Sequence, residues 1–131
     1  MDKAVQDPTL GTVGWFAFGA ATVGLTAGQT LRLSVVNLGA SDATVLCGIW
    51  SNPSPLSVAQ DSYTLSPGEA HNCDLDASDL PKQIFDKAGR VQIRGFVRSN
   101  SPTVCSNLEV FDSKTGKTTI ILPLQEVVQR D

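Results

Sequence analysis

Apolar and polar residues alternate with a period of two along most of this chain. In TLRLSVVNL (30–38), Leu31 and Leu33 lie on one side of an extended segment, whereas Arg32 and Ser34 lie on the other. The same alternation turns apolar side chains inward in RVQIRGFV, at Val91, Ile93 and Val97. A period of two is typical of β-strands with one buried face, and helical periodicity is almost absent.

Segments of this kind are separated by turn residues spaced roughly 8–12 positions apart, which is typical of an all-β sandwich or barrel. The turns TAGQ and SPGE each contain a glycine, Gly28 and Gly68, that can adopt the positive φ of a tight turn. KTG joins the last two strands as a hairpin. The predicted strands are 15–25 with a kink near Gly19, 30–38, 43–50, 56–65, the start of 71–80, 90–97, 107–113 and 117–123.

The sequence therefore predicts one domain over residues 1–131, an antiparallel immunoglobulin-like β-sandwich of about seven or eight strands. Residues 1–12 are expected to form an extended N-terminal segment. Residues 124–131 are expected to form a tail, either a short helix or a frayed end.

Four stretches carry a resemblance to known domains: LTAGQTLRLSVVN, LSPGE, GRVQIRGFV and LEVFDSKTGKT. Over residues 25–122 the chain resembles small immunoglobulin-like domains of bacterial proteins, many of them exported and uncharacterised. The resemblance implies the fold and an exported location. Because its motifs are turn glycines and alternating core residues, it implies no catalytic residue and no reaction.

Composition and charge exclude several functions. The formal net charge is −3 and no basic patch is present, so nucleic-acid binding is not expected. No apolar run approaches the roughly 20 residues that span a bilayer, so membrane insertion is not expected. No phosphate loop or dinucleotide fingerprint predicts a cofactor. The start MDKAVQDPTL lacks the apolar core of a signal peptide, so a cytoplasmic location stays the alternative to a secreted or periplasmic one.

The stretch HNCDLDASDL (71–80) gathers more reactive side chains than any other part of the chain. It contains His71, the single histidine, which is the only candidate base for a cysteine or serine nucleophile. On an extended strand His71 and Cys73 share a face, but their backbones are roughly 6–7 Å apart. We therefore expect a histidine at a strand end, and a protein that is not an enzyme.

Asp74, Asp76 and Asp79 form a weak calcium candidate. The spacing D-x-D-x-S begins like a calcium-binding loop, but Asp79 stands where the loop needs glycine and Phe85 where it needs glutamate. The alternative is that Asp76 or Ser78 caps the turn that follows, where a side-chain oxygen accepts from free backbone N–H groups.

The three cysteines leave the redox state open. Cys47 shares a face with Val45 and Ile49, and Cys73 shares a face with Leu75, so both thiols should point into the core. If their strands belong to opposing sheets, Cys47 and Cys73 could form an intersheet disulfide. Buried free cysteines are also common, so the alternative of free thiols stays open.

An aromatic surface is the more promising functional feature. If strands 43–50, 90–98 and 107–112 share a sheet, as the immunoglobulin order implies, their outward residues form an apolar face rimmed by arginine. Its members are Leu46, Trp50, Phe96 and Phe111, with Arg94 and Arg98 at the rim. Contiguous exposed apolar surfaces mark interfaces or ligand sites. The alternative is that the N-terminal segment or the tail covers this face as a second small core.

The function expected from these features is a non-catalytic interaction or structural module. It would bind a protein partner or a second copy of itself, through main-chain edges or the aromatic face, and self-association through the aromatic face is the expected form. The alternative is a carbohydrate-binding or adhesion module, because aromatic rings can stack on sugars. A component of a viral or phage particle is also compatible with a small β-sandwich.

Overall fold

The computed structural model describes residues 15–20, 22–52 and 57–127 of the 131-residue chain, and these residues are almost entirely β-structure. The strands are β1 (Phe16–Gly19), β2 (Val23–Thr26), β3 (Gln29–Asn37), β4 (Ala43–Asn52), β5 (Ser57–Leu65), β6 (Ala70–Asp76), β7 (Arg90–Ser99), β8 (Val104–Asp112), β9 (Thr118–Pro123) and β10 (Gln125–Glu126). Two short 3₁₀ turns, η1 (Ala77–Asp79) and η2 (Lys82–Ile84), lie between β6 and β7. This part of the chain contains no helix long and apolar enough to cross a membrane.

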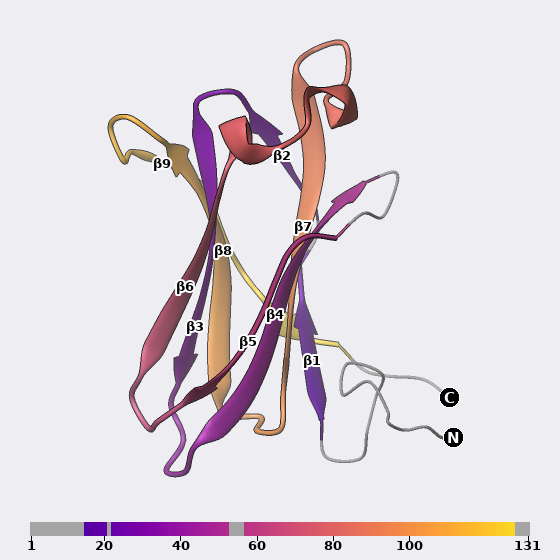
Figure 1. The fold of residues 1–131 in the computed structure, drawn as a ribbon. Helices are drawn as coiled ribbons and strands as arrows, with labels where there is room; N and C mark the ends of the chain where they lie inside the picture. Colours follow the sequence, from indigo (N-terminus) through magenta and orange to yellow (C-terminus); the bar gives the residue numbers. More distant parts are fainter. Residues whose placement is uncertain (1–14, 21, 53–56, 128–131) are drawn as a thin grey trace, which may run out of the picture.

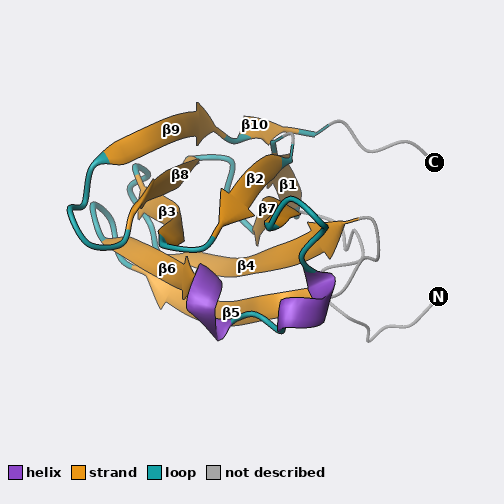
Figure 2. Cartoon of the chain, turned by 90° about the horizontal axis from the view of Figure 1, so that it is seen from above, coloured by secondary structure: helices purple, strands orange, loops and turns teal. Residues whose placement is uncertain are grey.

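The strands form two antiparallel sheets, seen as two layers in Figures 1 and 2. The first sheet has the order β10-β1-β7-β4-β5, with β2 also paired to β7. The second sheet has the order β6-β3-β8-β9. The predicted all-β, two-sheet architecture is therefore confirmed, and the inner faces of the two sheets enclose one core.

That core is built by the alternation seen in the sequence. Leu31, Leu33 and Val35 on β3 are almost completely buried, and so are Ile93 and Val97 on β7. Because each strand turns every second side chain inward, the two sheets meet through apolar side chains from both layers. Burying a side chain of this size contributes roughly 1.5–3 kcal/mol, so this contact dominates the stability of the fold.

Asn37, at the end of β3, ties a corner of the two sheets together. Its side chain is fully buried, and Nδ2 donates to the carbonyls of Leu65 at the end of β5 (3.0 Å) and Ser41 (2.8 Å). Its Oδ1 accepts from the backbone N–H of Gly39 at 2.9 Å. The N–H of Gly68 in the following turn donates to the Asn37 carbonyl. Asn37 therefore fixes the turn that leads from β5 in the first sheet to β6 in the second.

Several turn predictions are confirmed. Gly28 and Gly68 have φ values of +85° and +81°, as the tight turns require. The predicted strand 15–25 is interrupted after Gly19, so that β1 and β2 pair with different halves of β7.

Two predictions about chain organisation need correction. Residues 124–131 were expected to be a short helix or a frayed tail, but β10 within them pairs with β1, with Phe18 opposite Glu126. The strand at 107–112 was expected to share a sheet with 43–50 and 90–98, but β8 pairs with β3 in the second sheet. Strand partners depend on contacts between distant segments, which a local pattern does not encode. The predicted extended segment 1–12 lies outside the described residues.

Candidate functional site

The predicted aromatic face is divided between the two sheets. Leu46 and Trp50 on β4 lie beside β7, which carries Arg94, Phe96 and Arg98. Phe111 is on β8 in the second sheet, where it pairs across from Thr30 and its ring lies 5.1 Å from the Arg32 guanidinium carbon. Phe111 therefore cannot contribute to a surface with the other five residues, because the core separates the two outer faces.

The part of this face that remains on the first sheet is less open than expected. Leu46 is only 8% exposed, and Trp50 and Phe96 are half-buried, with ring centroids 5.9 Å apart. The Phe96 ring lies over Gly48, where any Cβ would collide with it. Trp50 and Phe96 thus pack on each other and on the backbone of β4.

The aspartates of the calcium candidate do not form a common site. Asp74 accepts two hydrogen bonds of 2.8 Å from the Arg32 guanidinium. Asp76 accepts from the N–H and hydroxyl of Ser78, and these bonds lower the pKa of its carboxyl below the usual value. Among the described residues, the carboxylates of Asp74, Asp76 and Asp79 do not converge as metal ligands. The calcium prediction is corrected, and the alternative prediction that Asp76 caps the turn is confirmed.

A different cluster forms where the edges of the two sheets meet. The turn at 66–69 joins β5, at the edge of the first sheet, to β6, at the edge of the second. On β5, Asp61 pairs across from buried Cys47, so its side chain lies on the inner face. On β6, His71 and Cys73 pair across from buried Val35 and Leu33 and also lie on the inner face. Two edge strands therefore direct polar side chains into the opening between the sheets.

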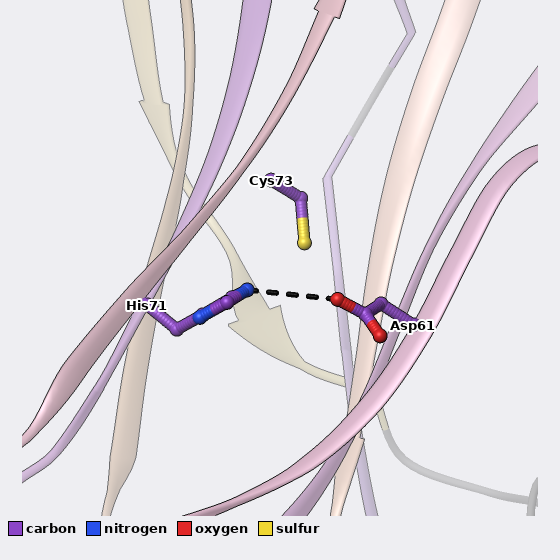
Figure 3. A group of neighbouring side chains, drawn as sticks. All are labelled: Asp61, His71 and Cys73. Carbon is purple, nitrogen blue, oxygen red and sulfur yellow. Dashed lines mark ion pairs between the residues drawn. The ribbon is translucent and has the colours of Figure 1, made fainter.

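The three polar side chains point into a common space, as Figure 3 shows. The His71 Nε2 lies 3.6 Å from Asp61 Oδ2, and one donor atom from each of Asp61, His71 and Cys73 lies within 4.8 Å of the others. The side chains of His71 and Asp61 are 41% and 55% exposed. Among the described residues, this is the group of histidine, cysteine and acidic side chains whose donor atoms converge closely enough to hold a metal ion.

Two thiols lie at the inner end of the cluster. The Cys47 and Cys73 sulfurs are 3.0 Å apart, across the two sheets, and both cysteines are free thiols. The predicted convergence of these two residues is confirmed, whereas the disulfide stays a prediction. The Tyr63 hydroxyl lies 3.6 Å from Cys47 Sγ, and its ring packs against the His71 imidazole with centroids 4.1 Å apart.

The hydrogen bonds among these groups separate their proton affinities. Donation from the Cys73 thiol, with a further bond from Tyr63, holds the pKa of Cys47 below its ordinary value. The same bond raises the pKa of Cys73, because its proton is shared with Cys47. Burial and the bond to Cys47 raise the pKa of Tyr63. The pair therefore releases its first proton more readily than its second.

The cluster opens to solvent through a pocket of about 240 Å³. Asp61, His71, Cys73 and Cys47 line it, together with Gln60 and Asn72. Several water-sized molecules fit into this volume, because each takes about 30 Å³ in the liquid. A small ion or reagent can thus reach the Cys73 sulfur from the surface, with the buried Cys47 sulfur directly behind it.

Sequence reasoning placed His71 and Cys73 on one face but gave the histidine no partner. Asp61 and Tyr63, which contact His71 from β5, were missed. The signal that could have found them is the alternation Asp61, Tyr63, Leu65, since Leu65 is plainly a core residue. Tracing that face through the following turn brings Asp61 and Tyr63 towards His71.

A second feature is the open edge at β9. β9 pairs with β8 only, so its other side has no neighbouring strand among the described residues. Ile120 and Ile121, whose side chains alternate between the two faces, are 40% and 55% exposed. The Leu124 N–H donates to the Ser106 carbonyl, and the antiparallel pattern continued from that pair directs the Ile121 N–H and carbonyl away from β8.

Comparisons with known proteins show the fold alone. No family model matches the chain, and no curated protein sequence matches it. The crystal structure of Thermotoga maritima 1070 is similar, with a TM-score of 0.51 and 17% sequence identity, over 85% of this chain and 91% of that one. This likeness agrees with the two-sheet architecture.

Proposed function

We propose that this protein is a non-catalytic interaction module that associates with a second copy of itself through the open edge of β9. The observation that carries the proposal is that Ile120 and Ile121 are exposed on opposite faces of an edge strand. Edge strands in monomeric proteins are usually blocked by charges, proline or a covering segment. In β9 the first five residues, Thr118–Leu122, contain neither a charge nor a proline.

Antiparallel pairing of two β9 strands fits this edge. If Ile121 of each copy lies opposite Ile121 of the other, each N–H can donate to the other carbonyl, and one twofold axis relates the copies. The two Ile121 side chains then meet on the outer face, and each Ile120 side chain lies opposite Leu122 of the other copy on the inner face. Pro123 at the end of β9 has no N–H to contribute, which limits the pairing to the short segment before it.

The aromatic face of the first sheet is the weaker candidate surface. Leu46 is buried, and Trp50 and Phe96 are half-buried, so a partner would gain less apolar contact there than at β9. Arg94 is exposed at its rim. This face would serve a protein partner if β9 does not mediate association.

Sedimentation velocity across a range of protein concentrations tests the proposal. The wild type should sediment increasingly as a dimer as its concentration rises. Ile121→Lys should sediment as a monomer, because a lysine pair at the twofold axis repels and the side chain is solvent-exposed in the monomer. Leu38→Lys is the matched control, since Leu38 is 65% exposed and lies after β3, away from β9.

The control should associate like the wild type. A wild type that stays monomeric at several hundred micromolar contradicts self-association. A dimer that persists in Ile121→Lys but is lost in Trp50→Ala moves the interface to the aromatic face.

We also propose that the sandwich is a variant of the immunoglobulin-like arrangement. The pairing of β3 with β6 in one sheet and of β4 with β7 in the other supports this relation. The variation lies in β8, which pairs with β3 instead of β7.

A further inference from the structure

The cluster at the β5 and β6 edges has the composition of a transition-metal site. Donor atoms of Asp61, His71 and Cys73 on β5 and β6 lie within 4.8 Å of one another, and the Cys47 sulfur on β4 lies outside this group, 3.0 Å from the Cys73 sulfur. Thiolate, imidazole and carboxylate are the ligand types of protein zinc sites, whereas calcium and magnesium prefer oxygen ligands alone. We propose that Asp61, His71 and Cys73 bind a Zn²⁺ ion that links the edges of the two sheets, and that the Cys47 thiol rotates towards the ion to become its fourth ligand.

The distance between His71 and Asp61 agrees with tetrahedral coordination, whereas Cys47 must move to join it. Zn²⁺ lies about 2.0–2.3 Å from its ligands, so tetrahedral donor atoms are separated by about 3.3–3.8 Å. The 3.6 Å between His71 Nε2 and Asp61 Oδ2 falls within this range. The sulfurs are 3.0 Å apart, about 0.8 Å less than in a tetrahedral site, so the Cys47 thiol would rotate away from Cys73 and towards the other donor atoms.

The orientation of His71 favours a metal over a catalytic relay. In a cysteine–histidine–aspartate relay, one ring nitrogen faces the sulfur and the other faces the carboxylate. In Figure 3 the Nε2 end of the ring points towards both Asp61 and the side of Cys73. Donor atoms that surround one point suit a central cation better than a proton passing through the ring.

The surroundings of the site suit a bound ion. The pocket of about 240 Å³ gives an ion access from solvent. The Tyr63 ring packs on the His71 imidazole, and its hydroxyl contacts Cys47 Sγ, so Tyr63 holds two of the ligands in place. Groups that support the ligands in this way orient a metal site and strengthen its affinity.

Binding would have a structural consequence that does not depend on the β9 interface. The ligands come from both sheets, so the ion would connect β5 and β6 directly at their open edges. An ion that binds only the folded state stabilises it by mass action. At a free Zn²⁺ concentration one hundred times Kd, Tm should rise by about 10 °C for a chain of this length.

The test uses the full chain with Cys105→Ser, which removes the exposed thiol on β8. After reduction and removal of metals, the protein is titrated with Co²⁺, followed by displacement with Zn²⁺. We expect one equivalent to bind, with a near-ultraviolet thiolate-to-cobalt absorption band and the visible bands of four-coordinate cobalt. Cys73→Ser, Cys47→Ser, His71→Ala and Asp61→Asn in this background should each lower the affinity at least tenfold.

Asp79→Asn in the same background is the matched control, because Asp79 is an exposed acid in η1 outside the cluster. Its affinity should equal that of the background protein. A cobalt spectrum without the thiolate band, or Zn²⁺ binding that is unchanged in Cys73→Ser and His71→Ala, overturns the proposal. So does a Cys47–Cys73 disulfide that forms equally fast with and without saturating Zn²⁺.

Discussion

Replacing Asn37 by alanine should strongly destabilise the fold. The side chain is fully buried and makes three hydrogen bonds of 2.8–3.0 Å, two as donor and one as acceptor. A typical hydrogen bond contributes about 1 kcal/mol, and a buried group left without its partner costs about 1–3 kcal/mol more. Loss of all three bonds, with the Leu65 carbonyl left in buried surroundings, should therefore destabilise the protein by about 4–6 kcal/mol.

Urea denaturation of the wild type and two alanine variants measures this effect. Asn100→Ala is the matched control, because Asn100 is exposed and its side chain accepts one bond, from the Thr44 N–H. The control should lose at most about 1 kcal/mol. If Asn37→Ala loses no more than the control, the Asn37 bonds do not hold the corner between the sheets, and the argument is refuted.

Three further predictions follow from individual contacts. Gly48→Ala should lower the free energy of unfolding by about 1–3 kcal/mol, because the new Cβ collides with the Phe96 ring. The loss should be smaller in a Phe96→Ala background, and additive losses in a double-mutant cycle would contradict this contact. Folding lowers the pKa of the Asp112 carboxyl, because two backbone N–H groups donate hydrogen bonds to it. The ionised carboxylate therefore stabilises the folded protein fully above the unfolded pKa of about 3.9, and this stabilisation is lost as the pH falls through the lower pKa of the folded state. The difference in urea midpoint between the wild type and Asp112→Asn should therefore decrease from pH 6 to pH 2. A difference that does not change with pH would contradict a stabilising role of the Asp112 charge. Millimolar calcium should leave Tm unchanged, because Arg32 already pairs with Asp74; an upward shift would revive the calcium site.

The strands of the fold could be predicted because the alternation of apolar and polar residues within each strand shows which of its side chains are buried. The inward set Leu31, Leu33, Ile93 and Val97 follows from alternation alone, and the structure buries all four. The cysteine convergence followed from the same rule, since Cys47 lies on an inward face of β4 and Cys73 on an inward face of β6.

The candidate sites depended on information that is not local. Phe111 was placed with Trp50 because β8 was assumed to pair within the first sheet, but it pairs with β3. The local sequence around His71 offers it no partner, because Asp61 comes to 3.6 Å only through the crossing of the chain from β5 in one sheet to β6 in the other. Alternation determines which side of a strand is buried, whereas the pairing of strands depends on tertiary contacts between segments that are distant in the sequence.

Hydrogen exchange at β9 tests the central claim, association through this edge, most directly. In the monomer the Ile121 amide faces away from β8 and should exchange within seconds, whereas the Ile120 and Leu122 amides face β8 and should be protected. Raising the protein concentration should slow exchange at Ile121 in the wild type and leave it fast in Ile121→Lys at the same position. Exchange at residue 121 that stays fast and independent of concentration would contradict an interface at this edge.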